Sequence, residues 1–139
     1  MEELQKLYTG YLDAVEQAQK KLVPASGLFG IGKRLSDDRC NDDFLEALGA
    51  YLAKKADTAA SQEAREILER VYDAPIRYQD APSAVYWIFI AAHGLTRPLI
   101  RRLSRQDAQR LLSWYQETYP RWERLPIQNQ VLKDLKAIA

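Results

Sequence analysis

The longest apolar run of the chain is Ala84-Val85-Tyr86-Trp87-Ile88-Phe89-Ile90-Ala91-Ala92. Its β-branched and aromatic residues fit a buried strand, but the rest of the sequence offers no second strand candidate with which it could pair. We therefore predict a helix from about Ser83 to His93, hydrophobic on nearly all faces, that ends at Gly94. The run falls well short of the roughly 20 residues that span a bilayer as a helix, so we expect it in the protein core.

Three amphipathic segments precede this run: residues 4–22, 44–52 and 64–72. Their apolar residues recur at spacings of three and four, a period typical of helices with one buried face. Thr58 or Ser61 is predicted to cap the third helix, although no Gly or Pro separates it from the second, so the two could also form one long helix with a bend. A break is expected at residues 73–75, where a proline stands.

Three further helices are predicted after the central run, over residues 97–103, 105–119 and 126–138. Ser104 with Asp107 resembles a capping box that opens the second of them, and Pro126 suits the first position of the last. Every strong signal is helical. We therefore predict an all-α fold, a single compact helical bundle of about six or seven helices around the central hydrophobic helix, with residues 1–139 forming one domain.

The composition excludes several classes of protein. The chain has 139 residues, of which 47% are hydrophobic and 28% charged, and this fits one soluble domain. A single Cys excludes an intrachain disulfide framework and multi-cysteine metal cages, and a single His excludes sites that need two imidazoles. We predict no catalytic, cofactor-binding or metal-binding residues and favour a protein that is not an enzyme, while acid–base chemistry by Tyr and carboxylates stays open.

The two ends carry no targeting signal that we recognise. Residues 1–11 are acidic and amphipathic rather than basic and apolar, and residues 136–139 match no lipidation or retention motif. The unpaired Cys40 fits a reducing compartment. We therefore expect a cytoplasmic protein without a membrane span.

Three local features have simpler explanations than chemistry. Residues 27–33 match the start of a phosphate-binding loop, but Arg34 stands where the hydroxyl for Mg²⁺ belongs, and no strand precedes the loop. The acidic residues within 37–46 suit the start of a helix better than a calcium loop. We interpret His93 as a structural residue whose positive ring faces the last carbonyls of its helix.

Charges are segregated along the chain. Residues 36–80 hold eleven acidic and six basic side chains, whereas residues 81–139 hold four acidic and nine basic ones, of which seven are arginine. Planar guanidinium groups suit carboxylates, phosphates and aromatic faces. Arginines and large aromatic residues of this second segment make up the candidate partner-binding set: Arg97, Arg101, Arg102, Arg105, Trp114, Arg121, Trp122 and Arg124.

Three interpretations of this set stay open. Arginine and aromatic residues are enriched at protein interfaces, so the first hypothesis is a protein-binding or regulatory module whose partner is another protein. The alternative is a helical domain that binds nucleic acid by phosphate contacts and base stacking. In the third, the basic half pairs with the acidic middle inside the domain, and Trp114 or Trp122 fills the core. None of the three calls for a cofactor.

Overall fold

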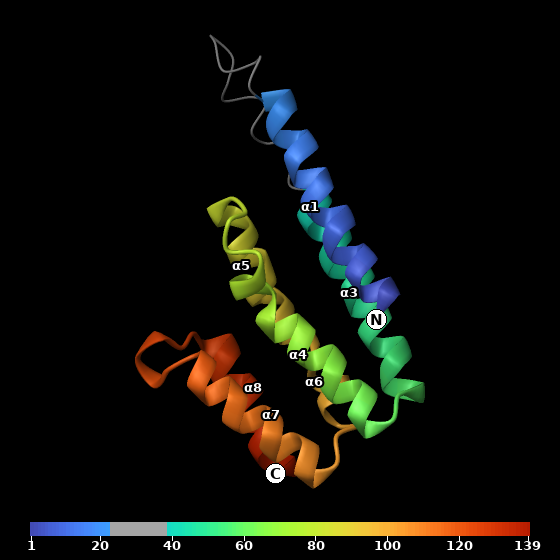
Figure 1. The fold of residues 1–139 in the computed structure, drawn as a ribbon, viewed down its shortest axis with the longest axis vertical. Coiled ribbons are helices and arrows are strands. Elements are labelled where there is room, and N and C mark those ends of the chain that lie inside the picture. The colour runs from blue at the N-terminus through green and yellow to red at the C-terminus, as the bar shows by residue number, and fades with distance from the viewer. Residues whose placement is uncertain (23–38) are drawn as a thin grey trace. The chain divides into compact units, whose positions relative to one another are not determined.

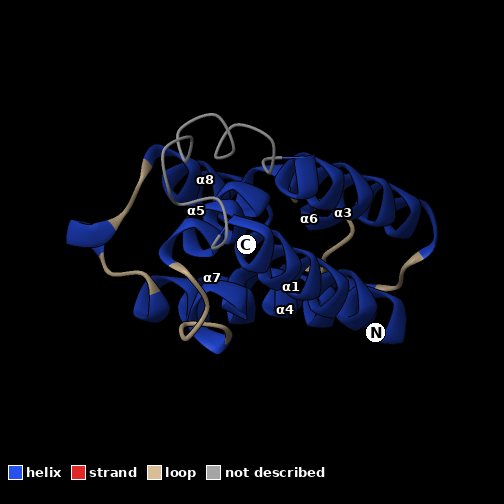
Figure 2. Cartoon of the chain, turned by 90° about the horizontal axis from the view of Figure 1, so that it is seen from above, coloured by secondary structure: helices blue, strands red, loops and turns tan. Residues whose placement is uncertain are grey.

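The computed structural model describes residues 1–22 and 39–139. Within these residues the regular elements are all helices and there is no strand (Figure 2), which confirms the predicted all-α fold. Contacts divide the chain into two compact units, an N-terminal unit of residues 1–48 and a C-terminal unit of residues 49–139. The single domain over residues 1–139 remains a prediction.

Two helices form the N-terminal unit: α1 (Glu2–Leu22) and the first half of α3 (Arg39–Thr58). The acidic first turn of α1, Glu2 and Glu3, suits the positive end of a helix. Its apolar stripe, predicted from spacing, packs on α3, where the Tyr11 ring stacks on Phe44 with the centroids 4.5 Å apart. The Tyr11 hydroxyl donates to Asn41 Oδ1 at 2.6 Å, so the buried phenol has its partner within the same unit.

Residues 42–72 form two helices, because α3 ends at Thr58 and α4 (Ser61–Arg77) begins after Ala59 and Ala60. The predicted cap of α4 is wrong. Ala60 occupies the N-cap without a side-chain hydrogen bond, since the Ser61 hydroxyl donates to Asp107 instead.

The break predicted at residues 73–75 is also wrong, because α4 continues through Pro75 to Arg77. Pro75 lies near the end of the helix, where its missing N–H removes a single backbone hydrogen bond. Its neighbours Val71, Tyr72 and Ala74 are buried, and their packing keeps the chain helical for two residues beyond the proline.

The C-terminal unit continues with six short elements: α5 (Ser83–Ala92), η3 (His93–Leu95), α6 (Arg97–Ile100), α7 (Arg105–Thr118), η4 (Arg121–Glu123) and α8 (Pro126–Ile138). Helix α4 packs against α5, α6 and α7, and α8 packs against α7 (Figure 1). The side chains of Phe89, Leu111, Tyr115 and Leu135 are completely buried and form part of the core between these helices.

Helix α5 begins at Ser83 as predicted but ends at Ala92, and Gly94 is not a stop, because η3 continues through it to Leu95. The burial of α5 also differs from the prediction. Val85, Phe89 and Ile90 face the core, whereas Tyr86 is 41% and Trp87 58% exposed. A short helix buries only the sides that its neighbours cover, so the apolar run is half core and half surface.

The predicted starts of the last two α-helices are confirmed. Ser104 caps α7, with its Oγ accepting from the backbone N–H of Asp107 at 3.1 Å, and Pro126 opens α8. Helix α6 is shorter than predicted and ends at Ile100 rather than at Leu103. Across the described ranges, no helix combines the length and the apolar character that crossing a bilayer requires.

Candidate functional site

The predicted partner-binding residues all lie in the C-terminal unit, where they fall into two groups near opposite ends of α7. The first group surrounds α6 and the start of α7: Arg97, Arg101, Arg102 and Arg105. The second surrounds the end of α7 and η4: Trp114, Arg121, Trp122 and Arg124. Helix α7 has 14 residues and is therefore about 20 Å long. Residues that form one run in the sequence are thus divided between the two ends of α7.

Three arginines of the first group are bonded within the chain. Arg97 Nη2 donates to Asp134 Oδ1 at 3.2 Å. Arg102 donates through Nε and Nη2 to the carbonyl of Ala59, at 3.1 and 3.0 Å, and so closes the end of α3. Arg105 Nε donates to the carbonyl of Ala139 at 3.1 Å. These guanidinium groups hold helix ends together, which leaves fewer N–H donors for a partner.

A polar network joins the first turns of α4 and α7 at the same end. Asp107 accepts hydrogen bonds from the Ser61 hydroxyl and, at 3.0 Å, from Arg65 Nε. The backbone N–H of Ser104 donates to Ser61 Oγ at 2.7 Å. The hydrogen bond from Ser61, reinforced by Ser104 and Arg65, lowers the pKa of Asp107. Hydrogen bonds therefore join the first turns of α4 and α7 at this end of the unit.

The second group is differently placed. Trp122 stands on η4 and is 83% exposed, while Trp114 is half-buried beside Tyr115. Arg124 Nε donates to the carbonyl of Tyr119 at 2.7 Å and fixes the turn that carries the tryptophan. Neither Trp114 nor Trp122 belongs to the buried core.

Three more apolar side chains of the C-terminal unit are exposed: Ile76 at 42%, Tyr86 at 41% and Trp87 at 58%. The Tyr119 hydroxyl donates to the carbonyl of Tyr72, which ties the end of α7 to the last turns of α4. Burial, with Tyr86 and Asp73 nearby, raises the pKa of Tyr119. The last turns of α4 thus lie against the end of α7, and the first turn of α5 and η4 follow these two helix ends along the chain. We call the exposed residues there, Ile76, Tyr86, Trp87 and Trp122, the aromatic end.

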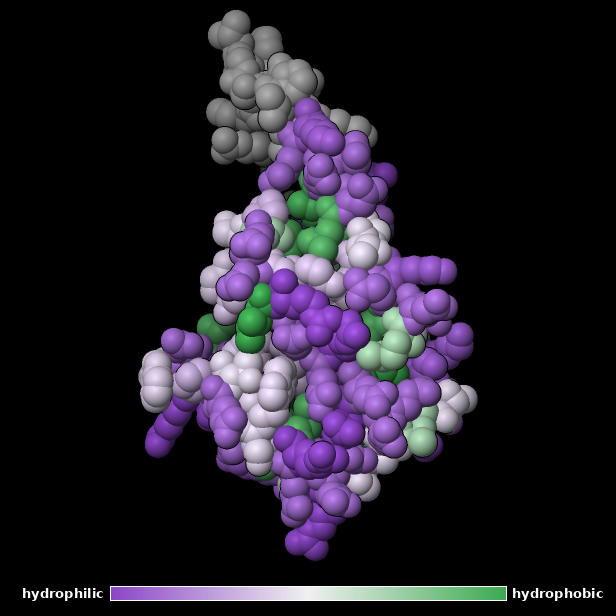
Figure 3. Space-filling view, viewed as in Figure 1, coloured by the Kyte–Doolittle hydropathy of each residue, from purple (hydrophilic) through white to green (hydrophobic). Residues whose placement is uncertain are grey.

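Sequence reasoning missed most of the aromatic end, because it assigned Tyr86 and Trp87 to the core. The run is apolar on all sides, so its sequence pattern does not indicate which face of the helix the neighbouring helices leave exposed. The space-filling view shows hydrophilic residues over most of the face in view, with hydrophobic residues visible only in small areas (Figure 3).

Behind the aromatic end lies a buried polar cluster. His93 Nδ1 is 2.9 Å from the hydroxyl of Tyr115, and the Tyr72 hydroxyl is 2.6 Å from Thr96 Oγ1, which in turn donates to the His93 carbonyl. Burial lowers the pKa of His93 to about 3, so its ring is neutral. The positive, helix-capping histidine expected from the sequence is therefore wrong, because the tyrosines of α4 and α7 surround the ring and exclude water.

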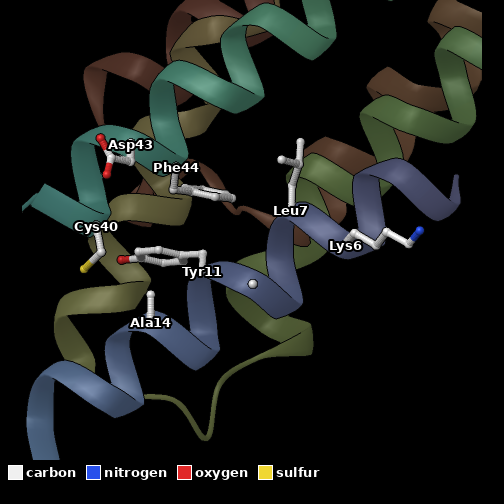
Figure 4. A pocket seen from close by; sticks show the side chains of 8 residues that line it. Lys6, Leu7, Tyr11, Ala14, Cys40, Asp43 and Phe44 are labelled. Atoms are coloured by element: carbon white, nitrogen blue, oxygen red, sulfur yellow. The ribbon is translucent and has the colours of Figure 1, made fainter.

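A groove in the N-terminal unit runs between α1 and α3. Figure 4 shows the rings of Tyr11 and Phe44 at its centre, with Cys40 near the hydroxyl end of Tyr11. Its volume is about 270 Å³, and Gly10 and Ala14 widen its floor on the α1 side. The Tyr11 hydroxyl on its wall already donates to Asn41, and we assign the groove no chemistry.

Two sequence features bear on phosphate and metal binding. The glycine-rich residues 27–33 lie outside the described residues. Asp42, Asp43 and Glu46 are exposed on α3. Within residues 1–22 and 39–139, no three His, Cys, Asp or Glu side chains are placed to hold a metal ion.

The predicted internal pairing of the basic half with the acidic middle is not what the described residues show. The ion pair that joins the two segments there is Arg65 with Asp107, at 3.0 Å, in which the acidic middle supplies the cation. The Arg97–Asp134 pair lies wholly within the basic half, and Arg77–Asp73 wholly within the acidic one.

Comparison of the chain with protein-family models, curated proteins and solved structures gives no match.

Proposed function

We propose that this chain is a cytoplasmic binding module without catalytic activity, which attaches to another protein through the aromatic end. One observation carries the proposal. Of the five large hydrophobic side chains exposed in the described residues, four belong to this end, and two of them are tryptophans. Large exposed aromatic residues are typical of protein interfaces, where Trp and Tyr are enriched among the few residues that dominate the binding energy.

The charges around the aromatic end favour a protein partner over nucleic acid. Arg77 is paired with Asp73 at 2.7 Å, and Arg121 is followed by Glu123 on the same turn. A strand of DNA or RNA needs a continuous positive surface along its phosphates. Mixed charges at a rim of exposed aromatics instead match the polar rim of a protein interface.

Site-specific photo-crosslinking in cells tests the proposal. A photoreactive phenylalanine is introduced at Trp122 in one variant and at Trp87 in another, and the matched control carries it at Gln109, an exposed position of α7. We expect the same protein to be cross-linked from both tryptophan positions and not from the control. No adduct from either position, or equal adducts from Gln109, would contradict the proposal.

A titration distinguishes the nucleic-acid alternative from the proposed protein-binding function. Short single- and double-stranded DNA and RNA are added to the purified protein at low and moderate salt while tryptophan emission is followed. If the partner is a protein, we expect neither DNA nor RNA to change the emission of the exposed tryptophans. Binding that weakens steeply with salt and shifts the emission would instead favour the nucleic-acid function, because releasing counterions from phosphates produces that dependence.

A further inference from the structure

The short helix η4 consists of a single turn, Arg121-Trp122-Glu123, and all three residues are exposed. Trp122 is 83% exposed, the largest fraction among the exposed large hydrophobic residues. Neither charged residue forms an ion pair with another described residue. Arg124 Nε donates to the carbonyl of Tyr119 at 2.7 Å and so closes the chain around the turn. A turn that is already fixed loses little conformational freedom when a partner binds to it.

The order of the three residues makes this turn complementary to a second copy of itself. In a two-fold symmetric pair, each contact from residue i to residue j is repeated from j to i. With the axis beside Trp122, the two indoles meet, and Arg121 of each copy faces Glu123 of the other. The three residues then form one tryptophan contact and two ion pairs of opposite charge. A different protein would need its own matching residues to reproduce these contacts.

A second pair of exposed rings adds to the apolar surface. Tyr86 and Trp87 are 41% and 58% exposed, and their ring centroids are 5.2 Å apart. Burial and, next, the nearby Tyr86 raise the pKa of Tyr119, which stands two residues before η4. The Tyr86–Trp87 pair therefore belongs to the surroundings of the turn.

The area of these rings indicates how strong such an interface could be. A large aromatic side chain has about 150–250 Å² of surface to bury, so Trp122, Trp87 and Tyr86 together expose about 400 Å² in each copy. A standard interface buries about 800 Å² on each partner, and smaller ones belong to transient complexes. The exposed rings therefore suit a weak, reversible dimer rather than an obligate one.

We propose that the aromatic end binds a second copy of this chain, with the two Arg121-Trp122-Glu123 turns packed against each other across a two-fold axis. This inference rests on the proposed function and names its partner. The dissociation constant expected for so small an interface is about 10–100 μM. At the low micromolar concentrations used in spectroscopic unfolding, the chain is then mostly monomeric.

Charge reversal on either side of Trp122 tests the two-fold pairing, with sedimentation velocity of the full chain as the measurement. Arg121→Glu brings acid against acid in both pairs, and Glu123→Arg brings arginine against arginine, so each variant should dimerise at least about tenfold more weakly. Mixed in equal amounts, the two variants should form a heterodimer with about the wild-type affinity, because both ion pairs are then restored.

Two further variants complete the set. Lys133→Glu makes the same change of charge as Arg121→Glu at an exposed position of α8, and it should leave the dissociation constant unchanged. Trp122→Ala should weaken dimerisation at least about thirtyfold, as expected for a tryptophan at the centre of an interface. Circular dichroism checks that each variant is folded.

The mass of the photo-crosslinked adduct from Trp122 separates this inference from the proposed function. An adduct with twice the mass of the chain would support a second copy as the partner. Adducts with a different protein alone would overturn self-association and leave the proposed function standing. No adduct at all would contradict both.

Three results in solution would also overturn the two-fold dimer. One is a chain that stays monomeric even at millimolar concentration. Another is a dimer that Arg121→Glu and Glu123→Arg do not weaken, which would place the contact elsewhere. The third is a mixture of these two variants that stays monomeric, which would show that residues 121 and 123 do not face each other.

Discussion

The first and last turns of α7 show two different uses of polar and aromatic residues. At the first turn, Ser104 and Asp107 bond to Ser61 and Arg65 of α4, so the polar groups satisfy one another. At the last turn, buried tyrosine rings make the contacts, with Tyr115 and Tyr119 centroids 5.0 Å apart, and the next turn leaves Trp122 in solvent.

This difference follows from the chemistry of helix ends. The first turn of a helix has free N–H groups that polar side chains must cap, so serines and acids gather there and draw arginines to them. Once a guanidinium is bonded in this way, it contributes to the fold rather than to a binding surface. At the aromatic end, α5 and η4 begin after Pro82 and Pro120, which make no side-chain capping bond, and the exposed rings take no part in capping.

The largest effect is expected from removing the core ring of the last turn. Tyr115→Ala should lower the free energy of unfolding by about 3–5 kcal/mol, because Tyr115 is fully buried and its loss leaves a cavity and an unpaired His93. Trp114→Ala, the adjacent half-buried residue, should cost less than half as much. Urea unfolding followed by far-UV circular dichroism measures both, and equal losses would contradict the assignment of Tyr115 to the core.

The neutral histidine behind the last turn makes stability depend on pH. Its pKa is about 3 in the folded protein and 6.5 in the unfolded chain, so the unfolded state takes up a proton first as the pH falls. Its contribution is complete above about pH 6.5 and declines by up to about 1.4 kcal/mol per pH unit until the folded pKa is reached. His93→Gln should flatten this slope. A His93 ring signal that titrates near pH 6.5 in the native protein would disprove the burial.

The junction at the first turn predicts a smaller loss. Asp107→Asn should destabilise the protein by about 1–2 kcal/mol, because it weakens the hydrogen bonds from Ser61 and Arg65. The same change at Asp73, a surface carboxylate paired with Arg77, should cost less than about 0.5 kcal/mol. Thermal unfolding of both variants gives the comparison.

The lowered pKa of Asp107 adds a pH dependence to that loss. The ionised carboxylate stabilises the fold fully above the ordinary aspartate pKa of about 4, and this stabilisation disappears as the pH falls through the lower folded value. The difference between the wild type and Asp107→Asn should therefore narrow below about pH 4. A difference that is constant from pH 7 to pH 3 would show that the charge of Asp107 is not involved.

The smallest effect is expected at the aromatic end itself. Trp122→Ala removes a side chain that is 83% exposed, so the midpoint of urea unfolding should move by less than the equivalent of about 0.5 kcal/mol. Loss of partner cross-linking at Trp87 in the same variant would then reflect the interface alone. A large loss of stability would instead assign Trp122 a structural role.

Helix periodicity and capping residues predicted most of the fold from the sequence. Ser104 and Pro126 have physical roles that depend on their immediate neighbours, and both predictions are confirmed. Pro75 was misjudged because its cost is local, whereas the packing that outweighs it comes from other helices. Sequence patterns thus predicted helix starts correctly where the deciding hydrogen bonds join residues close to one another in the chain.

The candidate site was predicted only in part, for the same reason. The sequence showed arginines at 97, 102 and 105, but their bonding partners at 134, 59 and 139 come from distant parts of the chain. Likewise, the exposure of Trp87 depends on which helices cover α5. Composition identified the right residue types, while only the three-dimensional packing separates bonded arginines from exposed aromatics.

The distribution of aromatic residues has an optical consequence. Six of the eight tyrosines are buried, whereas Trp87 and Trp122 are exposed and Trp114 is half-buried. Tryptophan emission should therefore change little on unfolding, because two indoles are already in water. The near-ultraviolet dichroism of the tyrosines, by contrast, should collapse with the core. The two chromophores thus report on separate events, the indoles on what touches the surface and the phenols on whether the interior is intact.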